Sequence, residues 1–273
     1  MVTLNQYFKT QRKKIDKRLD ELLPSIGTHP KVLHQAMRYS VFSAGKRIRP
    51  ILLITSCEAC GVKPDKALPV ACAIELIHTW TLIHDDLPAM DDDDMRRGHP
   101  ACHKQFGEAN AILAGTALMS LAFDILGSIK PPSCALKLIR GVAQAIGSTG
   151  VMAGQAVDKL HESKEVALPM LDYISIHKTA YLIKTSCWAG GIVAHASADR
   201  LRHLTKYGEY IGLAFQVVDD TLDGDGYRRI MSVGETRSLA ERLYAKSLRE
   251  SQAFKNKGKR LSEIAEFIVR RKK

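Results

Sequence analysis

The sequence has few cysteines and lacks the segments that mark exported or membrane proteins. Its six cysteines are scattered through apolar or mixed segments, and Cys57 and Cys60 form one C-x-x-C with no second pair at zinc spacing. Residues 1–23 are charged throughout and contain no apolar signal-peptide core. No stretch reaches the length needed to span a bilayer. These absences predict buried helix cysteines in a cytoplasmic protein without membrane insertion.

Alternating strand-like runs, low-complexity segments and periodic repeats are also scarce. Apolar residues instead recur at three- and four-residue spacing, as in Leu68, Ala71, Ile74 and Ile77. Glycine and proline breaks divide the chain into roughly ten helices with short connections. With 273 residues, 45% of them apolar, the chain can bury a sizeable core. We therefore expect an all-α fold in a single domain, residues 1–273.

Negative charge is in short supply, since 40 Lys and Arg stand against 29 Asp and Glu and give a formal charge of +11. Such a surface attracts anions, either nucleic acid, anionic lipid or a phosphorylated substrate. Much of the excess lies within residues 9–18 and 255–273, where solvated helix faces are the usual explanation. The sequence has no nucleic-acid recognition motif and no interleaved aromatic residues. We therefore expect no nucleic-acid partner.

The first aspartate cluster follows an apolar helix expected over Ala67 to Ile83. His78, on the narrow polar stripe of this helix, lies two turns before the first carboxylate of the cluster and should project from the same side. Pro88 disfavours further helix, so the chain should end the helix here and return through an irregular segment. The carboxylates expected to converge are those of Asp85, Asp86 and Asp91.

The second cluster combines Asp219, Asp220 and Asp223 at helical spacing, with Gln216 one turn earlier. Each pair of like charges at this spacing costs about 0.2–0.5 kcal/mol, so the arrangement calls for a cation. Oxygen-only carboxylate groups suit Mg²⁺, which commonly bridges them to substrate phosphates. A single acidic run is more often a solvated turn or helix end, but two runs after apolar helices favour a metal diphosphate site. The pattern of an EF-hand is missing.

Basic residues stand beside both clusters. The segment Gly45–Pro50 carries three cations within four residues, and Arg96 and Arg97 follow the first cluster. Arginine offers a planar fork and lysine a point charge, a combination typical of phosphate recognition. Lys178 and Thr179, after a helix-like stretch, are a weaker candidate for a further phosphate contact. One basic run beside a turn is commonly without function, but cations next to possible metal ligands favour phosphate binding.

These segments resemble the motifs of the trans-isoprenyl diphosphate synthases, particularly the bacterial farnesyl diphosphate synthases. The motifs are D-D-L-P-A-M-D from Asp85, followed by R-R-G, then F-Q-V-V-D-D-T-L-D from Phe215, and G-K-R-I-R-P from Gly45. His78, the pair Gly154-Gln155 with Asp158, and Lys178-Thr179 fall in the order of the family. The resemblance covers about residues 42–225 and implies helices around a deep central cavity and a homodimer.

The resemblance also implies roles for individual residues. The ligands of Mg²⁺, three ions per active site in such enzymes, would be Asp85, Asp86, Asp91, Asp219, Asp220 and Asp223. The contacts of the allylic diphosphate would be Arg96, Lys178, Thr179 and Gln216. The contacts of isopentenyl diphosphate would be Lys46, Arg49, His78 and Arg97. The catalytic set would be Asp85, Asp86, Asp91, Arg96, Lys178 and Asp219, which together promote departure of the allylic diphosphate.

The length of the product follows from the helix before the first cluster. Trp80 lies five residues before Asp85, with Thr81 beside it, so its ring should block a growing tail and stop the product at farnesyl diphosphate. Similar enzymes with an aromatic residue here and two extra residues in the first motif, Pro88 and Ala89, tend to make this product. The usual fate of a helix tryptophan is ordinary core packing. Geranyl and geranylgeranyl diphosphate are the alternative products.

One segment departs from the family pattern. The Gly-Lys loop that usually follows the second motif is replaced by Gly224-Asp225-Gly226-Tyr227-Arg228-Arg229, which looks shortened, and either arginine is a candidate substitute for the lysine. A terpene cyclase would need an Asn/Ser/Glu metal motif in place of the second aspartate cluster. A catalytically inactive regulatory homologue normally has one eroded motif, whereas both are intact here.

Overall fold

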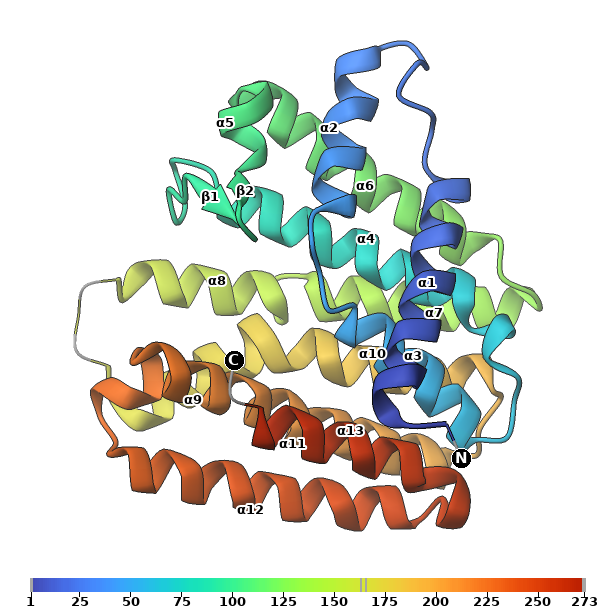
Figure 1. Cartoon of the computed structure of the whole chain (residues 1–273), viewed down its shortest axis with the longest axis vertical. Helices are drawn as coiled ribbons and strands as arrows, with labels where there is room; N and C mark the ends of the chain where they lie inside the picture. The colour runs from blue at the N-terminus through green and yellow to red at the C-terminus, as the bar shows by residue number, and fades with distance from the viewer. Residues whose placement is uncertain (1, 163, 165, 272–273) are drawn as a thin grey trace. The chain divides into compact units, whose positions relative to one another are not determined.

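The computed structural model describes residues 2–162, 164 and 166–271. These residues are almost entirely helical, as Figure 1 shows, and the all-α prediction is confirmed. The chain divides into two compact units, residues 1–51 with 68–135, and residues 52–67 with 136–273. The helices α3 (Ile48–Ala59) and α7 (Pro132–Ile146) run from the first unit into the second. That residues 1–273 form a single domain stays a prediction.

The first unit is built on α4 (Leu68–Asp85), which is apolar around most of its circumference. It packs against α6 (Glu108–Gly127), α1 (Leu4–Leu22) and α2 (Lys31–Phe42). Small buried residues of α6, such as Ala111 and Ala114, allow the close approach to α4. The remaining elements of this unit are β1 (Met95–Arg96), β2 (His99–Pro100) and α5 (Cys102–Phe106).

The helix α6 corrects one prediction. By length and composition it could cross a membrane, whereas the sequence was expected to hold no stretch of that length. The core helix of a soluble protein passes the same test. Because α6 packs along α4 and α2 and buries Leu118 and Ala122 among other residues, core packing accounts for the apolar character of that face. Ile112 and Leu113, on the other side of the helix, are exposed.

The second unit is built on α11 (Ala198–Asp223), which packs against α10 (Tyr181–Val193), α12 (Val233–Gln252) and α13 (Lys259–Arg270). Gly208 and Gly212 let it approach closely, because a Cβ at either position would lie within 2.8 Å of a backbone atom of the facing segment. Its other elements are η1 (Pro64–Lys66), α8 (Val151–Leu160), α9 (Leu168–Ile174), the π-helix η2 (Ser175–Ala180), α10 (Tyr181–Val193), η3 (Gly226–Arg229), α12 (Val233–Gln252), η4 (Lys255–Gly258) and α13 (Lys259–Arg270).

Within the described residues the α-helices number thirteen, more than the roughly ten helices expected from breaks in the sequence. Short helices such as α5 are too brief to establish a hydrophobic period. The hairpin of β1 and β2 was also not predicted. Arg97 and Gly98 both have positive φ at its tip, the conformation of a two-residue type I′ turn, and Arg96 pairs with His99.

Candidate active site

The first carboxylate cluster forms where α4 ends. The helix ends at Asp85, and the Asp91 amide donates a 2.8 Å hydrogen bond to the Asp85 carbonyl. The irregular segment therefore returns Asp91 to the helix end, as the proline in the sequence indicated. Asp85 and Asp91 are partly buried and Asp86 is buried. The backbone of the motif thus folds back on the helix end, and convergence of the three carboxylates stays a prediction.

Arg96 closes over this cluster from the β1 strand. Its Nε donates to Asp86 Oδ1 at 2.8 Å, its Nη2 contacts the same oxygen, and Nη2 also donates to Asp93 Oδ2 at 2.7 Å. Burial raises the pKa of the Asp86 carboxyl, and the Arg96 guanidinium opposes that rise. Arg96, the predicted diphosphate contact, is thus held in place by Asp86 of the motif and by Asp93 just after it.

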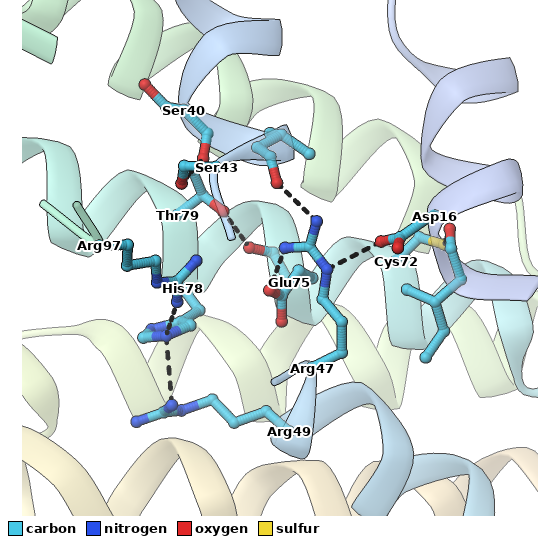
Figure 2. A network of polar contacts seen from close by, with 12 residues as sticks. Asp16, Ser40, Ser43, Arg47, Arg49, Cys72, Glu75, His78, Thr79 and Arg97 are labelled. Atoms are coloured by element: carbon cyan, nitrogen blue, oxygen red, sulfur yellow. Dashed lines mark hydrogen bonds and ion pairs between the residues drawn. The ribbon is translucent and has the colours of Figure 1, made fainter. Parts of the chain in front are cut away.

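A basic group lies beside α4, two turns before the carboxylates. Arg49 Nη1 lies 3.2 Å from His78 Nε2, and Arg97 Nη2 lies 3.5 Å from the same nitrogen. Figure 2 shows the imidazole between the two arginines. Lys46 is exposed, three residues before Arg49. The structure therefore gathers three of the four predicted isopentenyl diphosphate contacts, two arginines and the histidine between them, and the fourth is close by in the chain.

Arg47, the middle cation of the Gly45–Pro50 segment, is buried. This residue, which the sequence showed as part of a basic run, is only 5% exposed and is paired with Glu75. Its guanidinium is surrounded by protein acceptors and is not presented to a ligand. Residue spacing alone does not reveal which side chain of such a basic run turns inward, so the run keeps Lys46 and Arg49 as its candidate phosphate contacts.

The environment of His78 gives the first prediction. Burial, followed by the charges of Arg49 and Arg97, lowers the pKa of this imidazole well below its ordinary value. Below about pH 6.5 the unfolded chain therefore takes up a proton on His78 that the native protein excludes. The contribution of the neutral imidazole to folding stability is complete above that pH and is lost as the pH falls. Below about pH 6.5, the free energy of unfolding of the wild-type protein should fall by up to about 1.4 kcal/mol per pH unit relative to that of His78→Gln.

Urea unfolding of both proteins at pH 7.5, 6.5 and 5.5 measures this difference. Because Asp86 and the other shifted groups are shared, their effects cancel in the comparison to a first approximation. Parallel stability curves for the two proteins would show that His78 takes up its proton normally in the native state.

The second cluster lies at the end of α11 and is tied to the π-helix η2. Thr179 Oγ1 donates to Gln216 Oε1 at 2.7 Å, and Gln216 Nε2 donates to Asp220 Oδ1 at 2.7 Å. Asp220 is buried and its burial raises the pKa of the carboxyl to about 6. Asp223 is exposed and ends the helix. The structure thus connects three predicted residues in one chain of hydrogen bonds.

Lys178 lies in the same π-helix, whereas the sequence was expected to place it just after the end of a helix. Its Nζ forms a 2.7 Å ion pair with Asp158 Oδ2 of α8. The wider turn of a π-helix is often found at functional sites. A pocket of about 1160 Å³ opens here. Its lining includes Asp158, Lys178, Thr179, Gln216, Asp220 and Arg229.

The shortened segment after the second motif folds back on Asp220. The Tyr227 amide donates to Asp220 Oδ2 at 2.9 Å, and the Tyr227 hydroxyl donates to Asp172 Oδ1 at 2.5 Å. Arg228 donates to the Met231 carbonyl, whereas Arg229 lines the pocket and pairs with Asp225 at 2.5 Å. Of the two arginines considered as substitutes for the family lysine, Arg229 has the better placement.

The residues predicted to set product length lie inside the first unit. Trp80 is 8% exposed, and its Nε1 donates to His84 Nδ1 at 3.0 Å. Gly115 of α6 makes room for them, because a Cβ there would lie 2.6 Å from His84 Nε2. The Thr81 hydroxyl donates to the His78 carbonyl and is buried. The ring is therefore well fixed, one turn from the helix end.

Several neighbours of the clusters were missed by sequence analysis. Arg271, after α13, contacts Asp219 and places its guanidinium 4.1 Å above the centroid of the Phe215 ring. His103 of α5 is 5% exposed, and neither ring nitrogen has a hydrogen-bond partner among the described residues. No short-range signal identifies Arg271, which lies 52 residues beyond Asp219. His103 could have been noticed as a histidine shortly after the aspartate run.

The donor set suits a hard divalent cation. The carboxylates at the end of α4 supply oxygen ligands only, as Mg²⁺ prefers. A further group within the same segment, Asp92, Asp94 and His103, has ligand atoms within 4.8 Å of one another. Asp94 is paired there with Lys104 at 2.7 Å. An acidic, metal-binding type of cluster is thus present in the first unit.

The sequence and the fold match known proteins. A model described as polyprenyl synthetase matches residues 30–231. The chain is 44% identical over 229 residues to a farnesyl diphosphate synthase of Geobacillus stearothermophilus, covering 82% of this chain and 77% of that protein. It is 42% identical over 264 residues to a heterodimeric geranylgeranyl pyrophosphate synthase large subunit 1 of Arabidopsis thaliana, covering 87% and 71%.

A solved structure of an FPP/GFPP synthase from Zymomonas mobilis matches with a TM-score of 0.92 and 37% sequence identity. The match covers 97% of this chain and 98% of that one. The family model alone spans well over half of the chain, in agreement with the aspartate and basic motifs of both units. The chain belongs to the polyprenyl synthetase family and is a short-chain trans-prenyltransferase.

Proposed function

We propose that this prenyltransferase condenses dimethylallyl and geranyl diphosphate with isopentenyl diphosphate, head to tail (1′-4), and stops at farnesyl diphosphate. The observation that carries the proposal is the layout of α4. An acidic cluster ends this helix, and a basic group surrounds His78 seven residues earlier, about 10 Å along the axis. One helix thereby offers a site for a metal-bound diphosphate and a separate site for a diphosphate held by cations alone.

The family is Mg²⁺-dependent and uses isopentenyl and allylic diphosphates. We assign Mg²⁺ to the two aspartate clusters, with three ions per site as the proposed number. When bound, the ions would neutralise the charge that develops on the leaving diphosphate. The proposed ligands are Asp85, Asp86, Asp91, Asp219, Asp220 and Asp223.

The protein side chains have distinct tasks in the proposed reaction. Arg96 and Lys178 would stabilise the departing allylic diphosphate, which takes the electron pair of the broken C–O bond. Thr179 and Gln216, already hydrogen-bonded to each other, would orient it. The isopentenyl double bond then attacks the allylic carbon, and the released diphosphate accepts the proton lost from the new product. The proposed isopentenyl diphosphate contacts are Lys46, Arg49, His78 and Arg97.

Product analysis with the purified protein tests the function. Labelled isopentenyl diphosphate is incubated with Mg²⁺ and either dimethylallyl or geranyl diphosphate, and chain length is read by chromatography. We expect a fifteen-carbon product from both starters. A twenty-carbon product would instead assign geranylgeranyl diphosphate, the product named for the Arabidopsis relative. No condensation with either starter would leave an inactive regulatory homologue as the remaining alternative.

Replacing Trp80 by alanine should lengthen the product beyond fifteen carbons, because the ring is proposed to block the growing tail. The change removes a large buried side chain and should cost about 3–5 kcal/mol of stability, so assays are run well below the Tm of the variant. Trp188→Ala is the matched control, since Trp188 and the residue it packs against, Gly141, both belong to the second unit, whereas Trp80 belongs to the first. An unchanged product from Trp80→Ala would reduce Trp80 to ordinary core packing.

We also propose that the protein works as a cytoplasmic homodimer, which rests on the family resemblance. Light scattering of the purified protein tests the oligomeric state. A monomer that still condenses its substrates would reject the dimer without affecting the proposed reaction.

A further inference from the structure

Arg47 occupies an unusual position between two residues proposed to bind isopentenyl diphosphate. Its neighbour Lys46 is exposed and Arg49 is partly buried, whereas the Arg47 side chain is 3% exposed. Its φ of 52° lies in the left-handed region, which is uncommon for a residue with a long side chain. A strained conformation of this kind persists only where the surroundings hold it in place.

Three helices supply the acceptors that hold the Arg47 guanidinium. Nη1 donates to Glu75 Oε1 of α4 at 2.6 Å, and Nε donates to Asp16 Oδ1 of α1 at 2.9 Å. Nη2 donates to the Val41 carbonyl in the last turn of α2 at 2.6 Å. Figure 2 shows the guanidinium between Asp16 and Glu75. All of these residues lie in the first unit, so the network is internal to it.

The network fixes the start of α3. The Arg47 carbonyl accepts a 3.1 Å hydrogen bond from the Ile51 amide, so Arg47 stands immediately before the first turn of the helix that carries Arg49. Glu75 and His78 are three residues apart on α4 and share a face. The start of α3 is therefore joined to α4 at two levels one turn apart. Arg47 pairs with Glu75, and Arg49 contacts His78.

Arg97 packs against the same segment from the hairpin tip. A Cβ on Gly45 would lie only 2.8 Å from Arg97 Nη1, so the chain at Gly45 passes close to this guanidinium. A shift of the Gly45–Arg49 segment would thus disturb Arg97 as well as Lys46 and Arg49. Glu75 and Asp16 pair with the guanidinium of Arg47, and its charge is among those that lower the pKa of His78 and of Arg97.

We propose that Arg47 is a positioning residue, which, through its buried ion pair with Glu75, sets Lys46, Arg49 and Arg97 around His78 to receive the diphosphate of isopentenyl diphosphate. The assignment rests on the proposed function for the identity of that ligand. Arg47 itself does not touch substrate. The pairing matters because charge-assisted contacts to a diphosphate depend on the placement of each donor.

The double variant Arg47→Met/Glu75→Leu tests the proposal. Breaking a buried ion pair by removing one partner strongly destabilises a protein, whereas replacing both partners by apolar residues is often neutral. The double variant should therefore keep a Tm close to wild type while losing the link to α4. We expect its KM for isopentenyl diphosphate to rise about tenfold or more, which corresponds to the loss of roughly one charge-assisted hydrogen bond. Its KM for geranyl diphosphate should stay within about threefold of the wild-type value.

Two further variants separate positioning from stability. Arg47→Lys keeps the charge but loses the fork, so it should also raise the KM for isopentenyl diphosphate, by a smaller factor. Arg38→Met removes another arginine that ties α2 to the chain after α1, through the Leu23 and Pro24 carbonyls. It should lower the Tm without changing either KM. A wild-type KM for isopentenyl diphosphate in both Arg47 variants, or an equal rise for both substrates, would overturn the proposal.

Calorimetric titration with inorganic pyrophosphate, in chelator and without divalent cations, gives a readout that does not require turnover. We expect the folded Arg47 variants to bind pyrophosphate at least several-fold more weakly than wild type. If the wild-type enzyme condenses nothing but this difference persists, the proposed function fails and the positioning role stands. Equal binding by wild type and the folded variants would reject the positioning role. If the double variant does not fold, Arg47→Lys alone decides between these outcomes.

Discussion

Replacing Asp85 by alanine is expected to lower kcat by at least about 10³-fold, the range found when a principal electrostatic group is removed from an active site. Asp85 ends α4, beside the returning amide of Asp91 and next to the buried Asp86. Its carboxylate is the first of the proposed Mg²⁺ ligands. Without it, the charge on the departing diphosphate would be poorly compensated, so ionisation of the allylic substrate should slow severely.

A steady-state assay with saturating Mg²⁺ and both substrates measures this loss. Asp124→Ala is the matched control, because Asp124 is an exposed aspartate on α6. Thermal melting with Mg²⁺ and pyrophosphate adds a readout independent of turnover: wild type and Asp124→Ala should be stabilised, and Asp85→Ala should respond much less. A variant that retains more than about a tenth of wild-type kcat would remove Asp85 from the catalytic set.

Replacing Gly154 by alanine should have the largest effect on the second unit. A Cβ on Gly154 would lie 2.4 Å from the Lys178 amide nitrogen and 2.8 Å from the His177 carbonyl carbon. Because these are backbone atoms, α8 and the π-helix η2 must separate. Overpacking of this kind costs about 1–3 kcal/mol, and it displaces the turn that carries Lys178 and Thr179. We expect kcat/KM for the allylic substrate to fall at least about tenfold.

Urea unfolding gives the stability change, and kinetics with each substrate in turn give the functional change. Gly234→Ala is the control, because the nearest atom to its Cβ, Ser232 Oγ, lies 3.9 Å away. This control should be neutral or stabilising, as Gly to Ala usually is within a helix. If Gly154→Ala matched it in both stability and kinetics, the contact between α8 and η2 would have no role in placing Lys178.

The sequence was sufficient for the features that depend on local rules. The apolar period predicted the all-α fold, and Pro88 predicted that α4 ends near Asp85. Helical spacing also placed Gln216 on the face of Asp220, to which it donates a hydrogen bond. Each of these follows from residues within about two turns of one another, where backbone geometry alone fixes the neighbours.

Other features depended on residues far apart in the chain. In the sequence Arg47 is one of three cations in a basic run, and only its packing against α1 and α4 brings it to Asp16 and Glu75. The packing of the second unit likewise brings Arg271 to Asp219. It also brings the Tyr227 amide to Asp220, to which it donates a hydrogen bond.

The sequence by itself therefore determined which residue types are available, the helices that carry them and the chemistry of the two aspartate clusters. Tertiary structure alone decided which charges are buried and paired and which remain open to a ligand. The physical reason is that a side chain's helical neighbours are set by a fixed local geometry, whereas its burial and its distant partners depend on how whole helices pack. Arg47 and Arg49, two residues apart, illustrate the difference: one guanidinium is enclosed by carboxylates and the other meets His78.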